Sequence, residues 1–157
     1  YVMAERQHSF REIGELSCRI AHGLLAAGFG REAKGAVWAG NDPVAWTCTL
    51  GLWRAGMAWI PVNPRASADE NHYVLDTFEC EAIFFQKAFA PYVDVLRSRL
   101  PKVKLWICID DEHGDVPSLA NWTQWHPATR PEVACAMDDV VAISPTGGTT
   151  GMPKGGM

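Results

Sequence analysis

The sequence lacks several features that would assign it to whole classes of protein. Its 14 Lys and Arg residues stand against 18 Asp and Glu residues, a net charge of -4, and no basic cluster is present. We therefore expect no nucleic acid partner and no anionic membrane partner. No uncharged apolar run approaches the ~20 residues that a membrane helix needs, so no transmembrane segment is expected. The opening residues YVMAERQHSF have no apolar stretch of the secretory kind, which favours a cytoplasmic protein.

The cysteine pattern argues against a disulfide framework. The 5 cysteines are an odd number, and no two of them form a C-x-x-C pair. This pattern is typical of reduced, mostly buried thiols, and no protein metal site is predicted. The 157 residues, of which 48% are hydrophobic, suffice for a real core, so 1–157 is expected to be one globular domain or a piece of one.

Helix and strand patterns alternate along the chain. Capping boxes at Ser9/Glu12 and Ser67/Glu70, and Asp42 before Pro43, mark three helix starts. Helices are expected at 9–27, 43–56, 67–77, 89–96 and 119–125. Short apolar strands are expected at 36–39, 58–62, 81–85, 103–109 and 140–144. The alternation predicts right-handed crossovers and therefore an α/β fold, a mostly parallel sheet with helices on both faces.

The tryptophans fall mostly in these expected elements. We expect core packing for Trp38, Trp46, Trp53, Trp59 and Trp106. Trp122 and Trp125 lie in the short helix at 119–125, where we expect a local cluster.

The most informative stretch follows the last expected strand. It reads Ser144-Pro145-Thr146-Gly147-Gly148-Thr149-Thr150-Gly151-Met152-Pro153-Lys154-Gly155. Glycines let backbone N–H groups approach an anion, threonines supply hydroxyl donors, and the lysine supplies positive charge. The spacing is not that of a Walker A loop, which requires Gly before the lysine and Ser or Thr after it. The stretch is therefore predicted to bind a polyphosphate.

This order of residues resembles the phosphate-binding loop of the adenylate-forming (AMP-binding) superfamily. Two further signatures of that family have similar counterparts in this chain. The first is Ser9-Phe10-Arg11-Glu12-Ile13 followed by Ala21-His22-Gly23-Leu24. The second is Leu52-Trp53-Arg54-Ala55-Gly56 with Pro61-Val62-Asn63-Pro64-Arg65. The resemblance covers nearly the whole chain. It implies the incomplete N-terminal subdomain of an acyl-CoA synthetase, that is a carboxylate–CoA ligase with fatty acids among its candidate substrates.

The resemblance also implies a set of ligands and site residues. ATP with Mg2+, coenzyme A and a small carboxylic acid would be the co-substrates. The β- and γ-phosphates would be held by Thr146, Gly147, Gly148, Thr149, Thr150, Gly151 and Lys154. Many members have a serine at position 147 and an aromatic residue at 145, so Gly147 removes one hydroxyl donor. The family's catalytic residues lie beyond Met157.

Two alternatives stay open at this level. A peptide-synthetase adenylation domain carries the same loop and differs in its thiol acceptor. The chain begins without Met and ends after the loop, so we also expect a fragment that is inactive alone. An interrupted parallel sheet leaves an unpaired edge and apolar surface, so such a fragment could be a non-catalytic, associating unit or a homodimer.

Overall fold

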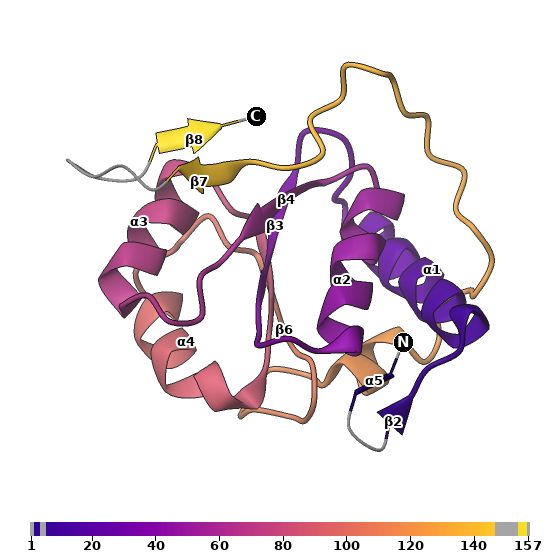
Figure 1. The fold of residues 1–157 in the computed structure, drawn as a ribbon, viewed down its shortest axis with the longest axis horizontal. Coiled ribbons are helices and arrows are strands. Elements are labelled where there is room, and N and C mark those ends of the chain that lie inside the picture. Colours follow the sequence, from indigo (N-terminus) through magenta and orange to yellow (C-terminus); the bar gives the residue numbers. More distant parts are fainter. Residues whose placement is uncertain (1, 4–5, 147–153, 157) are drawn as a thin grey trace.

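Residues 2–3, 6–146 and 154–156 are described by the computed structural model. Its centre is a sheet of four parallel strands in the order β4-β3-β5-β6 (Figure 1). The strands span Lys34–Trp38 (β3), Ala58–Pro61 (β4), Ala82–Phe85 (β5) and Leu105–Cys108 (β6). The predicted parallel sheet is confirmed, and these four strands begin and end within two residues of their expected bounds.

Helices cover both faces of the sheet, as predicted. One face carries α1 (Phe10–Ala26), α2 (Pro43–Arg54) and α5 (Leu119–Thr123). The other carries α3 (Ala68–Thr77) and α4 (Ala90–Arg97), which follows a 3-10 turn at Lys87–Phe89 (Figure 1). Successive strand residues point to opposite faces, so Phe84 joins the core under α1 and α2, whereas Phe85 joins the core under α3 and α4. Both faces of the sheet are therefore buried.

The helix starts follow the predicted local chemistry. The Ser9 hydroxyl accepts a hydrogen bond from the Glu12 amide at 3.2 Å, and the Glu12 carboxylate accepts one from the Ser9 amide at 2.8 Å. Ser67 and Glu70 form the same reciprocal pair. The carboxylate of Asp42 accepts hydrogen bonds from the first free amides of α2. These contacts satisfy donors that a helix leaves unpaired at its start.

The strand predicted at 140–144 is wrong in its extent. Only Ala142 bridges to the sheet, in parallel opposite Trp59 of β4. In a parallel ladder the next donor from β4 would be the backbone N–H of residue 61, but Pro61 has no backbone N–H. The chain then forms β7 (Ser144–Thr146), which pairs antiparallel with β8 (Lys154–Gly156). A second short pair, β1 (Val2–Met3) with β2 (Arg6–Gln7), precedes α1 and was not predicted.

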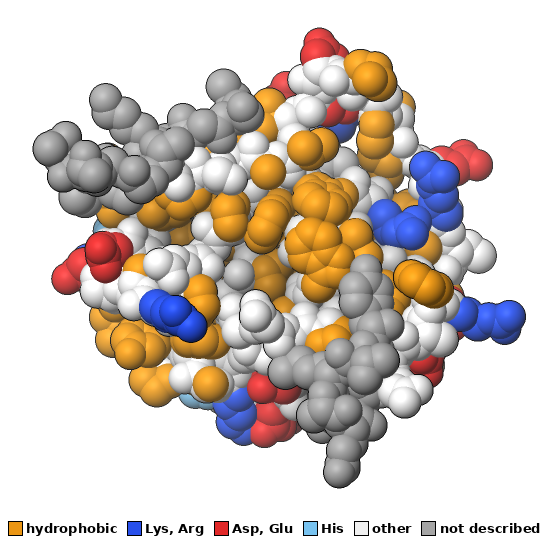
Figure 2. Space-filling model, viewed as in Figure 1, with side chains coloured by type: hydrophobic (Ala, Val, Ile, Leu, Met, Phe, Trp, Pro, Cys, Tyr) orange, Lys and Arg blue, Asp and Glu red, His pale blue; other side chains and the backbone are white. Residues whose placement is uncertain are grey.

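The tryptophan prediction holds for some positions and fails for others. Trp38 is 1% exposed and belongs to the core. Trp46 is 37% exposed, because β4 is the edge strand and α2 lies at the rim of the sheet. Trp122 packs edge-on against Phe84, with ring centroids 5.9 Å apart, but Trp125 is 86% exposed and forms no cluster with it. Figure 2 shows apolar side chains gathered on the face over α2 and β4.

Candidate phosphate-loop site

The segment that leads into the glycine-rich stretch is attached to the sheet at a single point. The Trp59 amide donates to the Val141 carbonyl at 3.0 Å, and the Ile143 amide donates to the Trp59 carbonyl at 2.9 Å. Residues 141–143 therefore run parallel to β4. Because Ala142 is level with Trp59, Ser144 is level with Pro61, where β4 ends. The chain thus enters the glycine-rich stretch at the carboxyl edge of the sheet.

The two ends of the predicted phosphate loop lie side by side. Thr146 pairs with Lys154 in the antiparallel register of β7 and β8. This pairing brings together two of the predicted site residues that are distant in the sequence. The other predicted residues, Gly147, Gly148, Thr149, Thr150 and Gly151, lie outside the described residues.

A second donor holds the same point of attachment. The indole Nε1–H of Trp53, in the last turn of α2, donates to the Val141 carbonyl at 2.8 Å. That carbonyl therefore accepts two hydrogen bonds, one from a side chain of α2 and one from the backbone of β4. Sequence reasoning missed this role of Trp53, because no spacing rule links a helix residue to a carbonyl 88 positions away.

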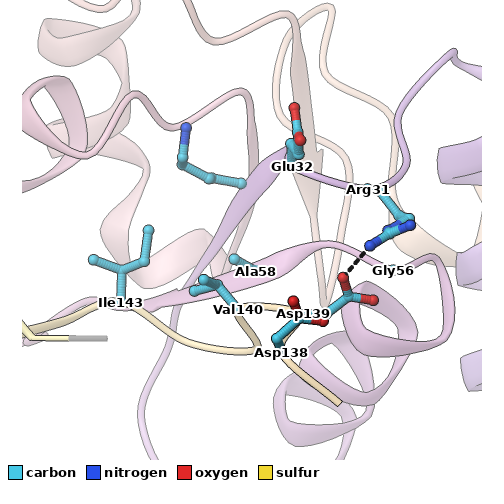
Figure 3. Close-up of a pocket in the computed structure, with 9 residues that line it drawn as sticks. Arg31, Glu32, Gly56, Ala58, Asp138, Asp139, Val140 and Ile143 are labelled. Atoms are coloured by element: carbon cyan, nitrogen blue, oxygen red, sulfur yellow. Dashed lines mark hydrogen bonds and ion pairs between the residues drawn. The ribbon is translucent and has the colours of Figure 1, made fainter. Parts of the chain in front are cut away.

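An ion pair fastens the segment further upstream. The guanidinium of Arg31 pairs with the carboxylate of Asp139 (Figure 3). Asp139 also accepts a hydrogen bond from the Ala136 amide at 2.7 Å. The Ala136 amide and then Arg31 hold the pKa of Asp139 below its ordinary value, because both favour the charged carboxylate. The segment before the loop is therefore held by side chains as well as by its two backbone hydrogen bonds to β4.

The ion pair lies in a cavity of about 410 Å³ at the amino ends of β3 and β4 (Figure 3). Its two cations are already paired, Arg31 with Asp139 and Lys34 with Glu79 at 3.6 Å. Asp138 and Glu32 add further negative charge to the lining. Ligands of open α/β sheets bind at the carboxyl ends of strands, whereas this cavity lies at the amino ends. Neither its position nor its acidic lining therefore suits a phosphate.

A second hollow, of about 360 Å³, lies at the carboxyl ends of β3 and β4. Trp46 and Trp59 form an aromatic wall there, and Asp42 stands at the start of α2. The Asp42 carboxylate occupies the helix amides that would otherwise attract an anion. Phosphate binding at this edge would therefore depend on the glycine-rich stretch itself.

The described residues contain no group of three or more His, Cys, Asp or Glu side chains placed to hold a metal ion. Cys18, Cys48, Cys80 and Cys108 are buried free thiols, whereas Cys135 is exposed. Burial raises the pKa of Cys80 to about 12. Mostly buried free thiols were predicted, and Cys135 is the exception.

The stem consists of residues 141–143 and the β7–β8 pair that follows them. The fold and this stem define an open, doubly wound α/β domain in which the glycine- and threonine-rich stretch begins at the carboxyl edge of the sheet. The profile of the AMP-binding enzyme family matches residues 1–157. The chain belongs to the AMP-binding enzyme family, as the loop sequence predicted.

Similar proteins agree with this assignment. The medium-chain acyl-CoA ligase Mig of Mycobacterium avium is 32% identical over 98% of this chain and 31% of its own length. The 4-hydroxybenzoate–CoA/benzoate–CoA ligase of Rhodopseudomonas palustris is 27% identical over 100% of this chain and 29% of its own length. The inhibitor-bound N-terminal domain of FACL13 from Mycobacterium tuberculosis superposes with a TM-score of 0.85 at 27% identity, over 96% of this chain and 37% of that chain.

The matched region is a minor part of these relatives. The chain spans 31% and 29% of the length of the two ligases. It covers 37% of the chain of the FACL13 N-terminal domain structure. None of the helices in the described part of the chain has the length and apolarity needed to cross a membrane.

Proposed function

We propose that this chain is the N-terminal portion of the large domain of an ATP-dependent carboxylate–CoA ligase, and that Ser144 to Gly155 is its phosphate loop. One observation carries the proposal: the glycine- and threonine-rich stretch begins at the carboxyl edge of the sheet, in a chain that matches the AMP-binding family throughout. Both curated relatives described above are named CoA ligases.

The proposed reaction has two steps. A carboxylate oxygen attacks the α-phosphorus of ATP, an acyl–AMP anhydride bond forms, and the bond to the β-phosphate breaks to release pyrophosphate. The thiol of coenzyme A then attacks the acyl carbon, and a thioester, AMP and a proton are released. The loop in this chain would hold the β- and γ-phosphates through Thr146, Gly147, Gly148, Thr149, Thr150, Gly151 and Lys154. Such holding contributes position and charge neutralisation.

Magnesium would enter with the nucleotide as Mg-ATP. Mg2+ usually keeps several waters and is held by phosphates with one or two carboxylates. No described residue of this chain is assigned as its ligand. ATP and coenzyme A as co-substrates also support the proposal of a cytoplasmic enzyme, with a small carboxylic acid as the third substrate.

Two other functions remain testable against this one. A peptide-synthetase adenylation domain would pass the acyl group to a carrier-protein thiol, and the named activities of the two relatives favour coenzyme A. An associating, non-catalytic fragment is favoured by the exposure of Trp46 and Val141 at the sheet edge, 37% and 61%. Light scattering after size exclusion separates a monomer from a homodimer.

The phosphate role is tested by titrating the 157-residue chain with Mg-ATP and with Mg-tripolyphosphate in a calorimeter. Lys154→Ala should weaken both ligands by roughly 10- to 100-fold, the effect expected for one charge-assisted hydrogen bond. Lys104→Ala is the matched control, because Lys104 pairs with Glu81 at 3.0 Å and directly precedes β6, the edge strand opposite β4. Equal binding by Lys154→Ala and the unaltered chain would contradict the proposal.

The ligase role is tested in a polypeptide that includes the family's remaining domains. Acid-dependent release of AMP and pyrophosphate, with formation of an acyl-CoA thioester, is the expected result for at least one acid in a panel. The 157-residue chain alone should catalyse no acid-dependent ATP–pyrophosphate exchange. Exchange by the purified chain would overturn that second expectation.

A further inference from the structure

We propose that Trp53 is a positioning residue for the phosphate loop, acting through the hydrogen bond from its indole to the Val141 carbonyl. The inference rests on the proposed function above, because it assigns a task to a residue outside the loop. Trp53 lies in the last turn of α2, and its indole contacts Val141, Trp46 and Trp59. Its effect would pass along the backbone from Val141 to Thr146.

Besides the Trp53 bond, this backbone is held by one bridge and by the packing of Ile143 against the core under α3 and α4. The ladder between 141–143 and β4 consists of one bridge, whose two hydrogen bonds both involve Trp59. Pro61 has no backbone N–H, so it cannot donate the next hydrogen bond of the ladder. Beyond Ile143 the chain pairs with β8 instead of the sheet. The position of the stem relative to the sheet is therefore set at Val141 and Ile143.

The indole of Trp53 is itself well placed to act as a fixed donor. Its ring packs edge-on against Trp46 and Trp59, with centroid separations of 5.5 and 6.2 Å. These contacts restrict the ring's orientation, since aromatic pairs prefer edge-to-face geometry. Its neighbour Leu52 is fully buried, so α2 is anchored to the core one residue away. The N–H is thus held by a rigid helix and two rings.

The two donors to Val141 also link separate elements. Trp59 reaches the carbonyl from β4, and Trp53 reaches it from α2, at 3.0 and 2.8 Å. A carbonyl with two lone pairs can accept both. Loss of one donor would leave the stem attached and would free it to shift relative to the sheet. The expected consequence is an intact fold with a less well placed loop.

The test compares Trp53→Phe with Trp106→Phe in the 157-residue chain. Both changes replace a partly buried tryptophan by a smaller ring and remove an indole N–H. Trp106 lies in β6, at the opposite edge of the sheet, whereas Trp53 donates to Val141. Calorimetric titration with Mg-tripolyphosphate should show the Kd raised about three- to tenfold in Trp53→Phe, at most the worth of one neutral hydrogen bond, because a stem that is free to shift must be ordered again on binding. The number of binding sites should be unchanged. Trp106→Phe should stay within about twofold.

The outcomes separate positioning from structural damage. A fall in the number of sites at constant Kd, or an equal rise in Kd for both variants, would overturn the positioning role. An unchanged Kd in Trp53→Phe would overturn it as well. Faster amide exchange at Ile143 in Trp53→Phe than in Trp106→Phe, together with the raised Kd, would support it. If the unaltered chain binds no tripolyphosphate, the proposed function itself fails, which is a different result from equal binding by all variants.

Discussion

The central sheet and its outer edge are held together in different ways. Within the sheet, β3, β4, β5 and β6 pair over whole strands and bury side chains on both faces. At the edge, 136–146 is attached by one backbone bridge, the Trp53 indole, the Arg31–Asp139 pair and the packing of Ile143 against the core. The contrast indicates that stability resides in the sheet, whereas the placement of the proposed loop depends on a few side-chain contacts.

The largest effect should come from a cavity in the sheet. Phe84 in β5 is fully buried, whereas Val141 at the edge is 61% exposed. Phe84→Ala should lower the free energy of unfolding by about 3–5 kcal/mol, and Val141→Ala by less than about 0.5 kcal/mol. Urea denaturation followed by circular dichroism measures both. Similar losses of unfolding free energy in the two variants would contradict the contrast between the sheet and its edge.

A smaller effect is expected from crowding the contact between α1 and α2. A Cβ on Gly51 would come within 2.4 Å of the Ile20 side chain, whereas a Cβ on Gly14 meets nothing within 4 Å. Gly51→Ala should therefore cost about 1–3 kcal/mol. Gly14→Ala, in the middle of α1, should gain about 0.5–1 kcal/mol from helix propensity. Thermal melts of the two variants check the predicted opposite signs.

Acid should loosen the edge before it unfolds the sheet. The folded-state pKa of Asp139 is lowered, so its contribution is present above the ordinary aspartate pKa of about 3.9 and is lost as pH falls through the lower, folded value. Amide exchange at Ala136 should accelerate in that window, and Asp139→Asn should show the faster exchange already at pH 7. Asp138→Asn is the control. Simultaneous acid loosening of Ala136 and of β5 amides would contradict the prediction.

The smallest perturbation uses thiol chemistry and leaves the fold intact. Cys135 lies exposed directly before the edge segment 136–146, whereas Cys48 and Cys80 are buried and their thiol pKa values are raised by burial. Iodoacetamide at neutral pH should alkylate Cys135 first and the buried thiols only at the rate of unfolding. Peptide mass mapping over time gives the order. Early labelling of Cys80 would show that the sheet opens as readily as the edge.

Sequence patterns predicted the interior of this protein better than its rim. The caps at Ser9, Asp42 and Ser67 and the four strands of the sheet were predictable because they depend on neighbouring residues and on apolar runs. The extent of the 140–144 strand was not, because it depends on which strand becomes its neighbour. That neighbour is β4, which ends in Pro61. Because Pro61 has no backbone N–H to donate, the ladder stops after the bridge between Trp59 and Ala142.

The candidate site likewise has a part that the sequence predicted and a part that it did not. The glycines, threonines and lysine of 146–154 were recognisable from their order, and the family match agrees with that recognition. Trp53 was assigned to core packing, and its hydrogen bond to Val141 could not be inferred. The bond exists only because α2 and the stem meet at the edge of β4. Arg31 and Asp139 likewise pair across 108 positions.

The amino-acid sequence by itself determined the helix starts, the buried strands, the α/β class and the family to which the chain belongs. These depend on local hydrogen bonding, on hydrophobic periodicity and on a contiguous motif. Only the tertiary structure decided the strand order, the exposure of Trp46 at the edge and the two donors that hold Val141. Those features depend on which distant segments come into contact, and no local pattern encodes that choice.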